Sequence, residues 1–119
     1  MKRYGLSRDD RIRRSSDFTR ITREGKRIPS RHFIIFFLNN DLDRNRLGIT
    51  ASRKVGGAVV RNKVKRSIRE VFRTNRNLLP PGGDVVVIAR HNASEADYAQ
   101  VRDELVTLFS RISDQVSEG

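Results

Sequence analysis

Hydrophobic and polar residues follow a helical period in three stretches of the chain and a strand-like pattern in three others. The helical stretches are residues 15–23, 58–75 and 95–113. Ser15 or Ser16 is the expected N-cap of the first helix, and Ser94 that of the last. The last helix carries one apolar stripe from Tyr98 to Ile112, which is typical of a helix packed on a core.

The strand-like stretches are residues 32–38, 46–53 and 84–90. The first and the last are almost wholly apolar, which indicates strands covered on both faces, whereas the middle one alternates apolar with small polar residues. Turn-forming residues at 39–41 predict a hairpin between the first two strands, and a short extra strand is expected near Ile28. The order α-β-β-α-β-α, with the extra strand, predicts an α/β (α+β) two-layer sandwich.

The length of 119 residues fits one domain, with residues 1–15 expected as a basic, flexible segment and residues 114–119 as a tail. The chain has no cysteine, which excludes disulfides and cysteine-based metal centres, and His32 and His91 are too few for a histidine-rich metal cluster. No apolar run approaches the ~18 residues of a membrane helix, and no secretory signal follows the basic N-terminus. We therefore expect a cytoplasmic protein without a membrane partner.

Charge is distributed unevenly along the chain. The 25 Lys and Arg residues exceed the 14 Asp and Glu residues by 11. Residues 1–31 carry 11 basic and 4 acidic side chains, residues 53–76 carry 9 and 1, and residues 77–119 carry 3 and 7. A charge kept only for solubility would be spread more evenly, so the two basic blocks favour a polyanionic partner such as a nucleic acid.

The helix expected at 58–75 has an apolar seam and a basic face about 120° away from it. Only Glu70 interrupts the charge, and Lys63 lies beside it. The basic face comprises Arg61, Lys65, Arg66, Arg69, Arg73 and Arg76, with Asn62 among them. Like charges without partner acids repel one another, so phosphate contact explains this face better than solvation does. The N-terminus after Gly56 and Gly57 could also hold a phosphate, or the two glycines could form a simple turn.

Phe18 and Phe36 could stack on unpaired bases, or they could pack in the core. One face of the middle strand carries Arg46 and the short side chains of Gly48 and Thr50, over which a nucleotide strand could lie closely. A basic helix beside an aromatic-bearing sheet favours single-stranded RNA or DNA over a duplex.

Motifs within residues 46–73 closely resemble the bacterial ribonuclease P protein family. These motifs are Arg46-Leu47-Gly48-Ile49, Ser52-Arg53-Lys54-Val55-Gly56, Ala58-Val59, Arg61-Asn62-Lys63-Val64-Lys65-Arg66 and Ile68-Arg69-Glu70-Val71-Phe72-Arg73. The resemblance extends over residues 6–112, including Asp17-Phe18 and the strand that ends Ile88-Ala89-Arg90.

The resemblance implies an accessory subunit that binds a catalytic RNA and the single-stranded 5′ leader of precursor tRNA. The RNA removes the leader by Mg²⁺-dependent hydrolysis, so no catalytic residue, no cofactor bound by the protein alone and no obligate protein partner is expected. It further implies a mixed sheet with a left-handed β-α-β crossover, against the usual right-handed rule.

The resemblance also implies two sets of binding residues. The leader would lie in a cleft formed by Phe18, Phe36, Ser52 and Lys54. The basic helix would face RNA through Arg61, Asn62, Lys63, Lys65, Arg66, Arg69 and Arg73. Two positions depart from the family pattern. Lys63 replaces an arginine and loses its bidentate fork, and Thr22 replaces a second aromatic residue that many members carry.

Two alternatives remain open. A ribosomal or other structural RNA-binding protein would share the charge blocks but would need no leader cleft. A protein nuclease would need metal-binding carboxylates, for which Asp41, Asp43 and Asp84 are candidates near strand ends. His32 and His91 are interpreted as surface or strand-end residues rather than as general acid–base groups.

Overall fold

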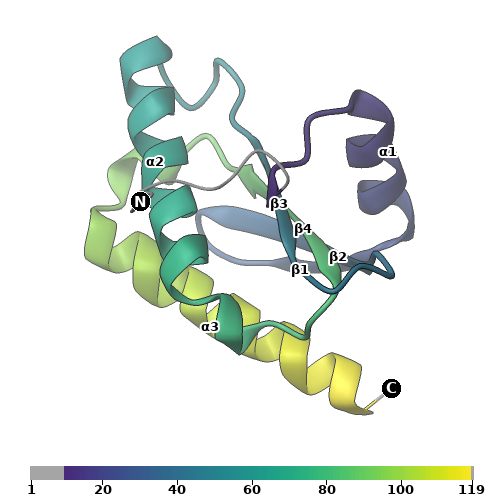
Figure 1. Cartoon of the computed structure of the whole chain (residues 1–119). Helices are drawn as coiled ribbons and strands as arrows, with labels where there is room; N and C mark the ends of the chain where they lie inside the picture. Colours follow the sequence, from purple (N-terminus) through teal and green to yellow (C-terminus); the bar gives the residue numbers. More distant parts are fainter. Residues whose placement is uncertain (1–9, 119) are drawn as a thin grey trace, which may run out of the picture.

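A computed structural model describes residues 10–118, which form a four-stranded sheet with helices on both of its faces (Figure 1). The strands are β1 (Lys26–Pro29), β2 (Phe33–Asn39), β3 (Arg46–Thr50) and β4 (Gly83–Ala89). The helices are α1 (Ser15–Glu24), α2 (Ala58–Thr74) and α3 (Tyr98–Glu118), with 3₁₀ turns η2 (Arg76–Leu78) and η3 (Ala93–Glu95). The mixed α+β fold predicted from the sequence is confirmed, and so is the short strand near Ile28.

The sheet has the strand order β1-β2-β4-β3. β4 pairs antiparallel with β2 and parallel with β3, so α2 is the crossover between two adjacent parallel strands. The expected hairpin between β2 and β3 is therefore wrong. The turn chemistry is present, since the backbone N–H of Asp41 donates to Asn39 Oδ1 at 2.9 Å. A turn only reverses the chain, however, and the apolar β4 takes the central place between the two strands.

The two faces of the sheet carry separate apolar cores. α2 and α3 cover one face, where the ring of Phe72 packs edge-on against Phe109 with centroids 6.5 Å apart. α1 covers part of the other face, where Ile21 packs with Phe36 and Val86. Figure 1 shows α1 on the opposite side of the sheet from α2 and α3. Between residues 10 and 118, no helix is long and apolar enough to cross a membrane.

Both serine caps predicted from the sequence are wrong. Arg14 occupies the N-cap of α1 without a side-chain hydrogen bond, and both candidate serines lie inside that helix. Ser94 lies within η3, and α3 begins later. The cap of α3 is reciprocal: the backbone N–H of Gln100 donates to Asp97 Oδ1 at 2.8 Å, and that of Asp97 donates to Gln100 Oε1 at 2.9 Å. This capping box satisfies two helix N–H groups at once, which Ser94 could not do.

The chain ends also differ from the expectation. α3 continues to Glu118, so the tail predicted from residue 114 is helical as far as the description reaches. Of the expected flexible segment, residues 1–9 lie outside the described residues. Ile12 of that segment is buried, and its backbone N–H donates to the carbonyl of Leu47 in β3 at 2.9 Å. Residues next to Ile12 are thereby held along the free edge of β3.

Candidate nucleic-acid interface

α2 is amphipathic in the way that its residue spacing predicts. Its apolar side chains Val64, Ile68, Val71 and Phe72 are buried in the core that α2 shares with α3. Its basic side chains turn away from that core. Asn62, Lys63 and Arg66 are exposed, whereas Arg61, Lys65, Arg69 and Arg73 are half-buried. One helix thus supports the core and presents a basic surface.

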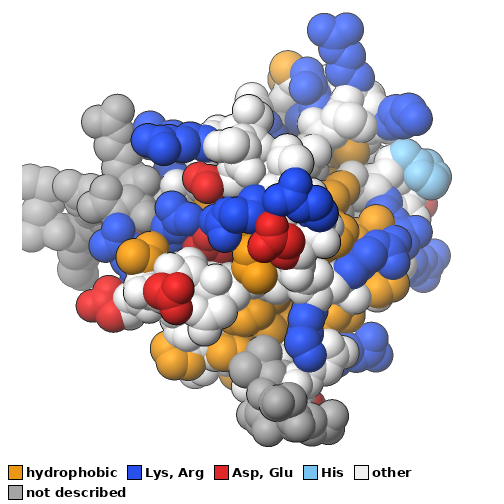
Figure 2. All heavy atoms as spheres, turned by 90° about the vertical axis from the view of Figure 1, so that its right-hand side faces the viewer, with side chains coloured by type: hydrophobic (Ala, Val, Ile, Leu, Met, Phe, Trp, Pro, Cys, Tyr) orange, Lys and Arg blue, Asp and Glu red, His pale blue; other side chains and the backbone are white. Residues whose placement is uncertain are grey.

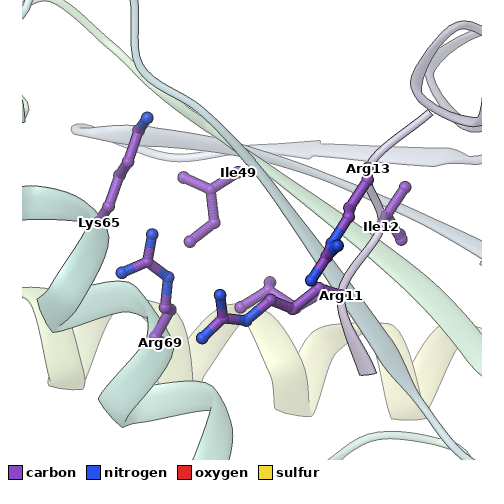
Figure 3. Close-up of a pocket in the computed structure, with 7 residues that line it drawn as sticks. Arg11, Ile12, Arg13, Ile49, Lys65 and Arg69 are labelled. Atoms are coloured by element: carbon purple, nitrogen blue, oxygen red, sulfur yellow. The ribbon is translucent and has the colours of Figure 1, made fainter. Parts of the chain in front are cut away.

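A pocket of about 200 Å³ separates α2 from the chain segment that precedes α1 (Figure 3). Lys65 and Arg69 project into it from α2, and Arg11 and Arg13 project into it from the opposite side. Apolar side chains complete its lining: Ile12, Leu47 and Ile49. We call this the four-cation pocket. Sequence reasoning missed Arg11 and Arg13, because only the pairing of their segment with β3 brings them to α2.

The four-cation pocket is electrostatically uncompensated. Among the described residues, no acidic side chain lines it. Burial lowers the pKa of the Arg69 guanidinium, and the nearby charges of Arg11 and Arg66 lower it further. The folded protein therefore holds this cation at a cost that a bound anion would offset. A phosphate group has the charge and the hydrogen-bond acceptors for such a site.

The exposed part of α2 forms a second hollow of about 360 Å³. Asn62, Lys63 and Arg66 line it together with Val59, which is 83% exposed. Arg73 is different, because it forms an ion pair with Glu70 one turn earlier, and this contact raises its pKa. The expectation of a basic face without partner acids is thus wrong for Arg73, and also for Arg76, which pairs with Asp10 at 2.9 Å.

The expected leader cleft on the α1 side is partly filled by side chains. Phe36 is only 8% exposed and packs with Ile21 and Val86. Phe18 is half-buried and lies over Gly48, where a Cβ atom would come within 2.7 Å of Phe18 Cζ. The face of β3 is therefore covered at Gly48 rather than open. Phe36 occupies a core position, and Phe18 keeps part of its ring accessible.

Arg46 is held by an acidic partner on the same face. Its Nε and Nη2 donate to the two carboxylate oxygens of Asp84 at 2.8 and 2.7 Å, and the hydrogen bond to Asp84 raises the pKa of Arg46 against the effect of burial. Asn40 donates a third hydrogen bond to Asp84, which is 1% exposed. Asp84 is thus a buried structural carboxylate, unlike the exposed candidates Asp41 and Asp43.

The other candidate residues of the cleft lie in the turn after β3 and in α1. Ser52 and Lys54 are exposed in the turn after β3, where the backbone N–H of Lys54 lies 3.3 Å from Ser52 Oγ. Thr22 lies one turn after Phe18 in α1 and donates its hydroxyl to the carbonyl of Phe18 at 2.9 Å. On this side of the molecule basic side chains are interspersed with acidic ones (Figure 2).

His32 lies at a strand end, directly before β2, as one of the two sequence-based interpretations had it, but its side chain is buried rather than at the surface. Its Nδ1 lies 2.8 Å from Glu104 Oε1, and its backbone N–H donates to Glu104 Oε2 at 2.8 Å. Ser30 donates to the same carboxylate. Burial raises the pKa of Glu104, but the hydrogen bonds from Ser30 and His32 outweigh it and hold the value below normal. This cluster ties the turn before β2 to α3, whereas His91 is exposed.

Comparisons with known proteins point to one family. Residues 6–113 match the family model described as Ribonuclease P. The "Ribonuclease P protein component" of Thermotoga maritima is 44% identical over 111 residues, which cover 90% of this chain and 95% of that relative. The protein of the same name from Desulfovibrio desulfuricans is 45% identical over 117 residues, covering 95% of this chain and 90% of that relative.

Solved structures agree with these sequence matches. The ribonuclease P protein of Thermotoga maritima superposes with a TM-score of 0.79 at 43% identity, covering 86% of this chain and 96% of that one. The ribonuclease P protein of Staphylococcus aureus superposes with a TM-score of 0.78 at 37% identity, covering 87% of this chain and 94% of that one.

Proposed function

Because this chain belongs to the ribonuclease P protein family, we propose that it binds the ribonuclease P RNA and the 5′ leader of precursor tRNA. In this proposal the protein assists a Mg²⁺-dependent cleavage by the RNA that gives the mature tRNA 5′ end. The protein supplies binding energy and position, and it contributes no catalytic residue.

The observation that carries the proposal is the four-cation pocket. Arg11, Arg13, Lys65 and Arg69 converge there without an acidic partner among the described residues. Phosphate groups of an RNA backbone would neutralise this repulsion, and each neutralised phosphate would release counterions. Exposed Arg66, beside this pocket on α2, extends the surface along which a backbone could run.

The α1 side is the proposed contact for the single-stranded leader. The accessible part of Phe18 offers a stacking surface, and the exposed Lys54 and Ser52 offer a cation and a hydroxyl in the turn after β3. Phe36 supports this surface from below through its packing with Val86. Base stacking on such a ring is worth about 1–3 kcal/mol and is tolerant of sequence.

Magnesium is proposed to be held mainly by the RNA. Among residues 10–118, no three His, Asp or Glu side chains gather as metal ligands would. Asp84, which is 1% exposed, already accepts two hydrogen bonds from Arg46. The proposed setting is the cytoplasm, where precursor tRNA would be met.

The test is reconstitution with the partner RNA at low Mg²⁺, comparing leader removal with and without the protein. We expect cleavage to rise when the protein is added, and binding to depend on the single-stranded 5′ extension. A ribosomal or other structural RNA-binding protein would bind precursor and mature tRNA alike. Cleavage by the protein without RNA would instead favour the nuclease alternative.

A further inference from the structure

A groove of about 360 Å³ lies between α2 and the start of α3, on the opposite side of Lys63 from the hollow that contains Val59. Val60 and Tyr98 form its exposed apolar lining, at 38% and 42% exposure. Ser67 and Asp97 add polar groups to its walls. Its volume lies within the ~300–1,000 Å³ typical of small-ligand sites.

The backbone at Tyr98 is fixed beside this groove. Tyr98 is the first residue of α3, and the reciprocal hydrogen bonds between Asp97 and Gln100 fix the start of that helix. Below it, Val101 and Ala93 are buried in the core. A tyrosine side chain has only two torsions to order, so it loses little conformational freedom when a flat ligand packs on it.

Lys63 connects the groove to the proposed RNA surface. It lines the groove, and it also lines the neighbouring hollow with Asn62 and Arg66. An occupant of the groove therefore has an apolar part against Tyr98 and Val60, and an anionic part beside Lys63. A nucleotide combines these properties, because a flat base is joined to a phosphate through a sugar.

We propose that this groove holds one unpaired nucleobase of the RNA that α2 binds, packed on Tyr98, with the adjoining phosphate at Lys63. The inference rests on the proposed function of α2. A second copy of this chain is the less suitable occupant, since two chains of formal charge +11 repel each other along this basic helix. The exposed carboxylate of Asp97 can accept a hydrogen bond from a base amino group.

Tyrosine emission provides a direct test. The chain contains no tryptophan and only two tyrosines, Tyr4 and Tyr98, so Tyr4→Phe leaves Tyr98 as the one fluorophore of its kind. The probes are a single-stranded RNA of about 12 nucleotides, a common site size, and an abasic strand with the same number of phosphates. We expect the RNA to quench Tyr98 emission and the abasic strand to leave it unchanged. Equal emission with both strands would overturn the proposal.

Affinities measured by fluorescence anisotropy give a second readout. Tyr98→Ala should weaken binding of the RNA about 5- to 150-fold, the equivalent of one lost stack, and should leave both the abasic affinity and the salt slope unchanged. Tyr98→Phe should retain the affinity. The matched control is Leu42→Ala, which removes an exposed apolar side chain from the loop after β2. Equal losses for both strands would contradict base binding.

The same measurements separate this proposal from the one on which it rests. If Arg66→Ala and Arg69→Ala also leave RNA affinity and salt slope unchanged, the proposed role of α2 fails. If those variants bind more weakly while Tyr98→Ala binds normally, only the base site fails. If Tyr98→Ala instead changes the sedimentation of the protein from dimer to monomer, the groove is an interface between copies.

Discussion

Replacing Arg69 by methionine should stabilise the folded protein and weaken its binding to RNA. Methionine keeps an unbranched side chain and a similar helix propensity, so the change mainly removes the charge. Arg69 lies in the four-cation pocket, and burial together with the charges of Arg11 and Arg66 lowers its pKa. Its charged form is therefore held less favourably in the folded state than in the unfolded state.

The expected gain in stability follows from the neighbours of Arg69. Arg66 lies three residues earlier on α2, and a like-charge pair at this spacing costs about 0.2–0.5 kcal/mol. We assign a similar cost to the repulsion between Arg69 and Arg11, because both like-charge contacts of Arg69 are partly exposed and therefore screened by solvent. Arg69→Met should thus raise the free energy of unfolding by about 0.5–1 kcal/mol, and the Tm by about 2–6 °C.

Urea or thermal unfolding at two salt concentrations tests this gain. Raising the salt from about 0.1 M to 1 M shortens the screening length from about 10 Å to 3 Å, so the advantage of Arg69→Met should shrink. The same variant should lower the slope of log affinity for RNA against log salt by about 0.7–0.9, the value for one lost phosphate contact. Arg111→Met is the control, because Arg111 is exposed on α3, away from the pocket.

Two results would refute this reasoning. An unchanged salt slope would mean that Arg69 contacts no phosphate. A loss of stability equal to that of an ordinary core truncation would mean that the stem of Arg69 supports the fold and that its charge carries no penalty. Stabilisation together with a reduced slope is the outcome that the pocket geometry predicts.

The remaining predictions concern the α1 side and the contact with α3. Gly48→Ala should lower the free energy of unfolding by about 1–3 kcal/mol, because the new Cβ would meet Phe18 at 2.7 Å. The measurement is urea unfolding, and the control is Gly57→Ala, where a Cβ meets nothing within 4 Å. Phe36→Ala should destabilise the protein by about 3–5 kcal/mol. Under conditions in which the variant is folded, its affinity for precursor tRNA is compared with its affinity for mature tRNA. A loss of affinity for the precursor alone would favour stacking of Phe36 on the leader over packing in the core. Glu104→Gln should lower the free energy of unfolding by about 1–3 kcal/mol at neutral pH, because it weakens the hydrogen bonds with Ser30 and His32. Hydrogen bonds hold the pKa of Glu104 below its ordinary value of 4.5. The contribution of the ionised Glu104 to the free energy of unfolding should therefore be lost as the pH falls below 4.5 and through the lowered pKa. Unfolding at several pH values measures this loss.

The local pattern of apolar and polar residues predicted most helices and strands, but it did not predict which strands pair with each other. The apolar run from Val85 to Ile88 indicated a strand buried on both faces, and β4 is one of the two central strands. The same run explains the wrong hairpin, because β4 can pair on both edges and separates β2 from β3. The cap at Asp97 was also missed, since serine and aspartate are about equally good caps and only the turn η3 removes Ser94 from the helix start.

The residues of the candidate site likewise fall into those that local spacing predicts and those that only the pairing of distant segments brings together. The basic face of α2 follows from its own residue spacing, so Lys65 and Arg69 could be found from the sequence. Arg11 and Arg13 could not, because their position depends on a bridge to Leu47, 36 residues further along the chain. Arg46 also required the structure, since its acidic partner Asp84 lies in a different strand.

Net charge alone therefore overstates the surface available to RNA. Arg46 is matched by Asp84 and Arg76 by Asp10, whereas the four-cation pocket has no such acid among the described residues. The matched arginines contribute to the fold, and their removal leaves an acid unpaired at a cost in stability. The unmatched cations repel one another until an anion binds, so replacing one of them by a neutral residue should raise the stability of the folded protein. The direction of the stability change on neutralising a given arginine thus identifies, before any RNA is added, whether its charge serves the fold or the partner.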